Sequence, residues 1–164
     1  MPRISLGQLG AGFTQAYKIN DGGQVVGISG AKAFLWTPGG TNGVLSNPQM
    51  QSLQPASGVQ QSKAFSINNS GLVVGMGIYS STTEYFGFAW DSASGWRDLN
   101  SVSNKPANCQ LQIARGCNNR TLNGVPAAQI VVSGYVTVTK TTIVRNKKTT
   151  TTTQEQHGFL LTPQ

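Results

Sequence analysis

The feature that most constrains this chain is an internal repeat with a spacing of 48 residues. Residues 16–27 read Ala-Tyr-Lys-Ile-Asn-Asp-Gly-Gly-Gln-Val-Val-Gly, and residues 64–75 read Ala-Phe-Ser-Ile-Asn-Asn-Ser-Gly-Leu-Val-Val-Gly. Seven of the twelve aligned positions are identical, and a second matching block follows in each copy, Ala33-Phe-Leu-Trp36 and Gly87-Phe-Ala-Trp90. Self-similarity at a fixed period indicates one small structural unit that is used several times.

A third copy is eroded but still recognisable. Gln129-Ile-Val-Val132 takes the place of Gln24-Val-Val-Gly27, and the block from Gly158 to Pro163 takes the place of the block from Ala33 to Pro38. The chain of 164 residues is therefore interpreted as a single β-repeat domain, 1–164. Its predicted parts are repeat 1 at about 6–50, repeat 2 at about 51–100 and a degenerate repeat 3 at about 101–164, with an inserted Thr-rich hairpin at about 135–156.

Each repeat reads as an antiparallel β-meander. Asn-Asp-Gly-Gly and Asn-Asn-Ser-Gly are tight-turn sequences, and the Val-Val pair that follows favours a pleated strand. No window has a sustained apolar period of 3.6 residues, so we expect an all-β fold with almost no helix. The predicted core contains four residues of each of the first two repeats: Ile19, Val25, Phe34, Trp36, Ile67, Val73, Phe88 and Trp90.

These motifs resemble a known family. Leu6-Gly-Gln-Leu-Gly10, the Ile-Asn-x-x-Gly-x-Val-Val-Gly segments and the triplets Lys32-Ala-Phe34, Phe86-Gly-Phe88 and His157-Gly-Phe159 are similar to the HAF family of bacterial extracellular repeats. The resemblance spans about residues 6–163 and weakens between about 104 and 156. It implies an extracellular or cell-surface location and a propeller-like stack of small sheets, and it implies no chemistry.

The number of repeats departs from a closed propeller, which typically needs at least four blades. Three repeats leave three alternatives: a C-terminal fragment of a longer protein, a propeller completed by an oligomer, or another architecture such as a three-fold β-prism. The hairpin at about 135–156 also has two interpretations. It is either a solvent-facing flap whose charges protect its edges or an arm that pairs with another chain.

The charges give a second view of possible partners. Lysine and arginine number 12 against 5 aspartate and glutamate residues, a net charge of +7, and a basic surface attracts polyanions. The one basic cluster is Arg145, Lys147 and Lys148, at the predicted tip of the hairpin. Trp96 lies outside the repeated motifs and could be an exposed platform for a sugar. These four residues are the candidate contacts of a glycan- or polyanion-binding module.

Catalytic groups are scarce in this sequence. The five carboxylates show no paired spacing of the kind that a glycosidase needs, and the single histidine, His157, occupies a repeat position without a Gly-x-Ser-x-Gly motif elsewhere. We therefore expect no enzyme activity, no metal site and no cofactor.

Cys109 and Cys117 are either a short-loop disulfide, which would fit an extracellular setting, or two free thiols. No stretch approaches the ~20 apolar residues that cross a membrane. The first residues lack an apolar signal core, so we expect a processed or excised segment or another route of export. The favoured function is a secreted or cell-surface, non-catalytic module for structure, adhesion or self-assembly through contacts with other chains, including itself. The alternative is the glycan- or polyanion-binding module.

Overall fold

A computed structural model describes residues 3–55, 57–102, 104–145 and 147–163, and shows an all-β protein. The described residues contain no α-helix, and the one helical turn is the 3-10 helix η1 (Leu99–Ser101). The all-β prediction is confirmed. Within the described part of the chain, no helix is long and apolar enough to span a membrane.

The first two sheets are four-stranded antiparallel meanders whose strands follow chain order. Sheet 1 consists of β1 (Thr14–Ile19), β2 (Val25–Ser29), β3 (Lys32–Trp36) and β4 (Met50–Ser52). Sheet 2 consists of β5 (Val59–Ile67), β6 (Val73–Tyr79), β7 (Tyr85–Asp91) and β8 (Gly95–Asp98).

Sheet 3 has three strands in the order β13-β12-β9 and lacks a fourth. Its strands are β9 (Cys109–Cys117), β12 (Ile130–Val144) and β13 (Lys147–Leu161). A small ribbon of β10 (Thr121–Leu122) and β11 (Val125–Pro126) is inserted between β9 and β12. None of the described sheets closes on itself.

The strands of the three sheets pair in the same register, and this register explains why the motif ends in glycine in the first two repeats. In sheets 1 and 2 the glycine that ends Val-Val-Gly lies opposite the phenylalanine of the third strand, as in the pair Gly75 and Phe88, and in sheet 3 Val132 holds that place opposite Phe159. A Cβ atom at Gly75 would lie 1.9 Å from the main-chain oxygen of Lys63 and 2.7 Å from the Phe88 ring. The absence of a side chain is thus what lets the main chain of the first strand and the aromatic ring of the third both pack closely against the second strand.

The first strand of each sheet also carries a β-bulge at the same place. The bulge residues are Tyr17, Phe65 and Arg115, each directly after the alanine of the motif or its equivalent. The Tyr17 and Phe65 rings lie 5.4 Å apart, and the Arg115 guanidinium lies 5.7 Å from the centre of the Phe65 ring. Because a bulge re-aims a side chain, the three residues form a stack that links neighbouring sheets.

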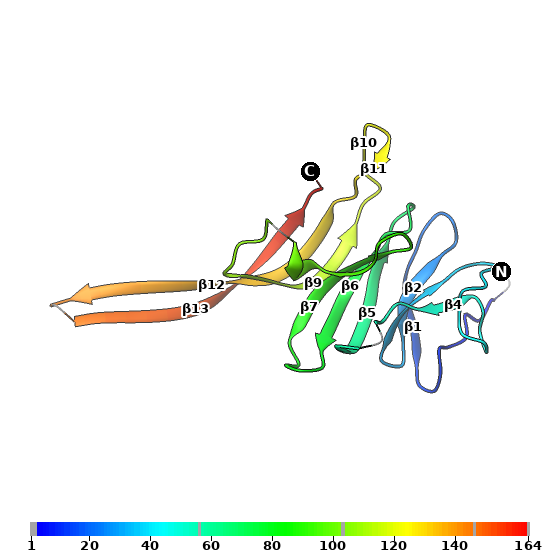
Figure 1. The fold of residues 1–164 in the computed structure, drawn as a ribbon, viewed down its shortest axis with the longest axis horizontal. Helices are drawn as coiled ribbons and strands as arrows, with labels where there is room; N and C mark the ends of the chain where they lie inside the picture. Colours follow the sequence, from blue (N-terminus) through cyan, green and yellow to red (C-terminus); the bar gives the residue numbers. More distant parts are fainter. Residues whose placement is uncertain (1–2, 56, 103, 146, 164) are drawn as a thin grey trace.

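The sheets follow one another along the longest axis of the molecule (Figure 1). Strand β5 packs on β1, β2 and β3, and β9 packs in the same way on β5, β6 and β7. Two apolar cores result. The core between sheets 1 and 2 contains Val26, Leu35, Ala64 and Ile67, and the core between sheets 2 and 3 contains Val74, Ala89, Leu111 and Ala114.

The predicted core residues are mostly but not all buried. Val25, Phe34, Ile67, Val73 and Phe88 are buried, and Trp36 and Trp90 are half-buried. The prediction for Ile19 is wrong, because its side chain is 59% exposed. Its equivalent Ile67 is 2% exposed because β5 has a preceding sheet to pack on, whereas β1 has none.

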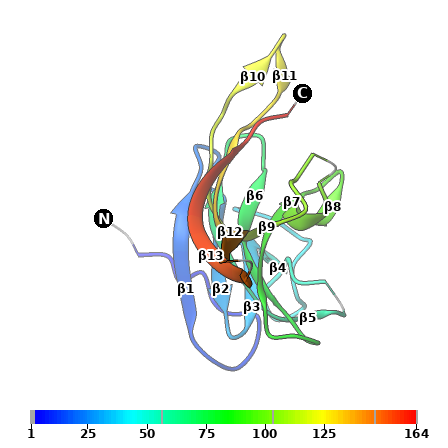
Figure 2. The ribbon, with the colours of Figure 1, turned by 90° about the vertical axis from the view of Figure 1, so that its left-hand side faces the viewer.

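The Thr-rich hairpin is an extension of β12 and β13, each of 15 residues and longer than the roughly ten that the sequence suggested. Residues 138–153, here named the arm, reach beyond β9 and project away from the sheets (Figures 1 and 2). Threonine pairs face each other across it: Thr139 lies 3.3 Å from Thr152 and Thr141 lies 3.3 Å from Thr150, oxygen to oxygen. Residue 146, within this range, lies outside the described residues.

Candidate interaction surfaces

A ladder of asparagine side chains ties the three sheets together at their first turns. The Asn20 Nδ2 donates to the main-chain oxygen of Asn68 at 3.0 Å, and the Asn68 Nδ2 donates to that of Asn118 at 2.9 Å. Each Oδ1 also accepts from the main chain of its own turn, from Gln24 in the first and from Gln129 in the third. The asparagine of the Ile-Asn motif therefore closes its own turn and joins it to the next.

The two ends of this stack are open and apolar. At one end, Ile19 is 59% exposed and Ala16 is also exposed. At the other end, Val131 and Leu160 are 48% and 59% exposed. Equivalent residues of sheet 2 are buried, so the exposure arises from a missing neighbour and not from a polar local sequence.

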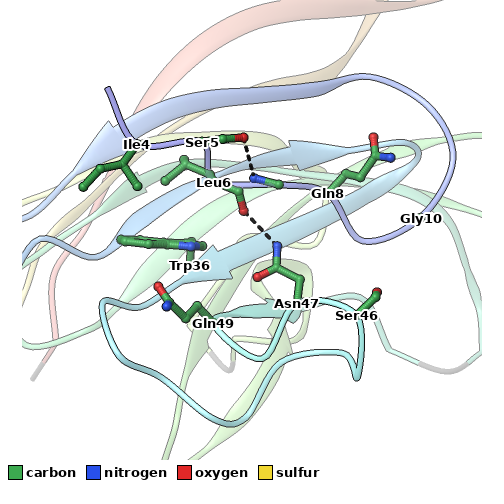
Figure 3. A pocket seen from close by; sticks show the side chains of 10 residues that line it. Ile4, Ser5, Leu6, Gln8, Gly10, Trp36, Ser46, Asn47 and Gln49 are labelled. Atoms are coloured by element: carbon green, nitrogen blue, oxygen red, sulfur yellow. Dashed lines mark hydrogen bonds between the residues drawn. The ribbon is translucent and has the colours of Figure 1, made fainter. Parts of the chain in front are cut away.

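A groove of about 490 Å³ lies beside the N-terminal segment, where Leu6 runs past Trp36 (Figure 3). The Asn47 Nδ2 donates to the main-chain oxygen of Leu6 at 2.8 Å. Leu6 and Leu9 pack on the core formed by Val25, Phe34 and Met50. This segment therefore covers β2, β3 and β4 on the outer face of sheet 1 and leaves β1 open.

A larger apolar groove of about 630 Å³ lies between sheets 2 and 3, lined by residues that include Leu99, Val102 and Phe159. In sheets 1 and 2 the corresponding place is filled from the fourth strand. Met50 of β4 packs with Phe34, and Trp96 of β8 stacks on Phe88 with ring centres 3.8 Å apart. Sheet 3 has no fourth strand, so its groove and the outer edge of β13 both remain open.

Trp96, a candidate sugar platform, packs in the core of sheet 2. It lies against Phe86 as well as Phe88 and is half-buried. An aromatic ring that binds sugar presents a free face, and here one face of Trp96 is already covered by Phe88. Trp96 and Met50 occupy equivalent places in the fourth strands, an equivalence that the strand register shows and that the sequence hides, because the spacing from Trp36 to Met50 differs from that between Trp90 and Trp96.

The basic residues lie at the far end of the arm. Arg145, Lys147 and Lys148 are all exposed, and among the described residues no carboxylate lies within 4 Å of them. The structure keeps these three cations together at the end of the arm but places Trp96 in β8 of sheet 2. The four predicted contacts therefore do not form a single site.

The two cysteines are free thiols. Cys109 and Cys117 begin and end strand β9, which separates their Cα atoms by about 26 Å at the ordinary strand rise. A disulfide needs Cα atoms closer than about 7 Å, so the short-loop disulfide is wrong for this structure. Burial raises the pKa of both thiols, and the Cys117 sulfur lies 3.4 Å from the main-chain oxygen of Leu72.

The carboxylates serve local structure. The Arg97 guanidinium donates to Asp91 at 2.5 Å; partial burial acts to raise the pKa of Asp91, but hydrogen bonds from Ser94 and Arg97 outweigh it and lower that pKa. Burial, and then the hydrogen bond to Asp98, raise the pKa of the Tyr79 hydroxyl. Among the residues that the structure describes, no three His, Cys, Asp or Glu side chains gather to hold a metal ion. His157 lies exposed on β13, with its ring 6.1 Å from that of Phe159.

Comparison of the chain with family models, with curated proteins and with solved structures finds no match. The resemblance to the HAF repeats therefore stays a prediction. What the molecule presents is a set of surfaces for contact: two apolar ends, an open strand edge beside a groove, and a long arm.

Proposed function

We propose that this chain is a secreted or cell-surface, non-catalytic β-repeat module that acts in structure, adhesion or self-assembly through contacts with other protein chains. Its sheets are taken as three blades of an incomplete propeller-like stack, and a three-fold prism is the alternative arrangement. The sequential packing of β5 on sheet 1 and of β9 on sheet 2 favours the stack, because each sheet uses its first strand against the preceding sheet.

The observation that carries this proposal is the arm. Beyond Thr137, which still bonds to Asn108, β12 and β13 pair only with each other among the residues that the structure describes. A two-stranded hairpin is marginally stable in water, and both of its outer edges offer unpaired N–H and C=O groups. An extended strand of another chain can pair with such an edge by β-augmentation.

The arm's composition suits a partner that pairs through its backbone. Half of its side chains are threonine, a good β-former that adds little apolar surface, and the exposed apolar residues Ile143 and Val144 lie near its tip. With Trp96 packed in sheet 2, the glycan- or polyanion-binding alternative rests on the three basic residues at the tip alone. The backbone edges extend along the whole arm, so protein contact is favoured.

Shortening the arm tests this function. A variant that lacks residues 140–151, with Thr139 joined to Thr152 through Asn-Gly, keeps the part of β12 that pairs with β9. Light scattering should show large assemblies for the intact chain and smaller ones for the variant. A matched variant with Arg145, Lys147 and Lys148 changed to Gln keeps the edges and removes the charge. If assembly follows the charge instead of the edges, or if neither change alters it, the proposal fails.

A further inference from the structure

We infer that the partner is a second copy of this chain, whose β1 docks on the open face of sheet 3 so that copies stack head to tail. This inference rests on the proposed function and names its partner and surface. The open face is defined by Val131 of β12 and Leu160 of β13.

The template for this contact is already present twice inside the chain. Between sheets 1 and 2, Ala64 and Ile67 of β5 pack on Val26 and Leu35. These four side chains are all at least 94% buried, since the most exposed of them, Leu35, is 6% exposed.

The same arrangement recurs between sheets 2 and 3. There, Ala114 of β9 packs in one core with Val74 and Ala89. In both interfaces the first strand of one sheet covers the second and third strands of the sheet before it.

The two open ends carry the two halves of that interface. By register, Val131 and Leu160 are paired with each other as Val26 is with Leu35 and Val74 is with Ala89. In the same way, Ala16 and Ile19 of β1 hold the places of Ala64 and Ile67. The exposed face of β1 at one end of the chain therefore complements the exposed face of β12 and β13 at the other end. Two different, complementary surfaces are the condition for a heterologous, head-to-tail contact.

The asparagine ladder indicates the direction in which a second copy would dock. In each internal step, the Asn Nδ2 of one repeat donates to the Asn main-chain oxygen of the next. At the end of the ladder, among the described residues, the Asn118 Nδ2 keeps only the bond within its own repeat, to Gln129 Oε1 at 3.0 Å, whereas the Asn20 Nδ2 bonds both to Gln24 Oε1 and to the next asparagine carbonyl. At the beginning, the Asn20 main-chain oxygen accepts from Gly23 alone among the described donors, whereas that of Asn68 accepts from both Gly71 and Asn20. A docked copy would restore the missing step from Asn118 to Asn20.

The arm is placed to hold such a copy. It continues past sheet 3 in the direction in which the sheets follow one another (Figures 1 and 2). Its seven residues on each side, 138–144 and 147–153, span about 24 Å, whereas packed sheets lie about 10 Å apart. The arm of one copy therefore reaches alongside about the first two sheets of the next. On the receiving copy, the N-terminal segment covers β2, β3 and β4 and leaves β1 accessible.

Complementation of two blocked ends tests this inference. Ile19→Lys blocks one end and Val131→Lys blocks the other, and both residues are exposed in the single chain, so each variant should fold. Lysine is used at both places so that the two blocked ends repel and cannot form a new ion pair. Alone, each variant should be monomeric by light scattering at concentrations where the intact chain assembles. Mixed in equal amounts, they should give a 1:1 dimer, because one intact end of each kind remains.

Tyr85→Lys is the matched control, since Tyr85 is 44% exposed but lies on the middle sheet. It should assemble like the intact chain, and circular dichroism should show the same fold for all variants. A second variant that blocks the sheet 3 end, Leu160→Lys, should have the same assembly behaviour as Val131→Lys. The inference is overturned if the intact chain is monomeric, if the blocked variants still assemble, or if their mixture gives no dimer. If shortening the arm reduces assembly but blocking the ends does not, the inference is overturned and the proposed function stands. If neither change affects assembly, both are overturned.

Discussion

Sheet 2 and sheet 3 have the same pairing register and differ in their surroundings. Sheet 2 has four strands and lies between two neighbours, so that Val74 is 0% exposed and Ala89 is 2% exposed. In sheet 3 the fourth strand is absent and one face has no neighbour, and the equivalent residues Val131 and Leu160 are about half exposed. Burial of a residue in a repeat thus depends on whether another sheet follows, and local sequence alone does not determine it.

The phenylalanines of the third strands give the largest expected difference between these two sheets. Phe88 is 0% exposed and stacks on Trp96, so Phe88→Ala should lower the free energy of unfolding by roughly 3–5 kcal/mol. Phe159 holds the same register position but is half-buried beside an open groove, so Phe159→Ala should cost markedly less. Urea unfolding followed by fluorescence measures both. Equal losses would mean that the groove beside Phe159 is filled in solution.

The isoleucines of the first strands compare the middle sheet with sheet 1. Ile67→Ala removes a 2% exposed side chain from the core and should cost roughly 2–5 kcal/mol. Ile19→Ala should change stability by no more than about 0.5 kcal/mol at concentrations where the chain is monomeric. The comparison becomes sharper if the measurement is repeated at higher concentration, where docking of a second copy would make the Ile19 substitution costly. A large loss in the monomer would show that β1 is covered within one chain.

The repeat in the sequence predicted more of this structure than any other feature. The turns at Asn20 to Gly23 and at Asn68 to Gly71 are confirmed, with Gly23 and Gly71 each donating to the asparagine carbonyl. Val-Val-Gly predicted a strand, but the sequence could not show that its glycine makes room for a phenylalanine from the neighbouring strand. That reason depends on the register between strands, which becomes visible only once they pair.

The candidate site was harder to predict for a related reason. Ile19 was assigned to the core because it matches Ile67, and a match between repeats contains no information about which sheet lies at an end of the stack and lacks a neighbour. Trp96 was judged to lie outside the repeat because the fourth strands differ in sequence, although Trp96 and Met50 hold equivalent places. Burial in the interior of a repeat array can thus be predicted from the motif. Burial at the ends of the array can be predicted only when the packing order of the sheets is known.

Substitutions in the asparagine ladder should also destabilise the interior of the stack more than its end, but by a smaller difference in the free energy of unfolding. Asn68 is 4% exposed, and Asn68→Asp keeps the acceptor for Ser70 and Leu72 while replacing the donor to the Asn118 carbonyl with a second oxygen. A loss of about 1–3 kcal/mol is expected, the usual cost of a buried polar group without its partner. Asn118→Asp should cost less, because Asn118 is exposed and its Nδ2 bonds only to the side chain of Gln129. Chemical denaturation of both variants measures the difference, and an equal cost would count against the ladder as a link between sheets.

The smallest expected effect concerns the turn that leads into the fourth strand, which sheet 2 has and sheet 3 lacks. Hydrogen bonds from Ser94 and Arg97 hold the pKa of Asp91 below its ordinary value of 3.8, against the opposing effect of partial burial. A carboxyl group whose pKa is lower in the folded state stabilises the fold fully above its unfolded pKa, and this contribution disappears as the pH falls through the folded pKa. The stability of the intact chain should therefore decline below about pH 4 by more than that of Asp91→Asn. Arg97→Gln, which removes the charged donor and leaves the main-chain donors of Ala93 and Ser94, should lie between them, and added salt should shrink the difference because the pair is partly exposed. Identical pH profiles for all three chains would show that this turn contributes nothing to holding β8 in place.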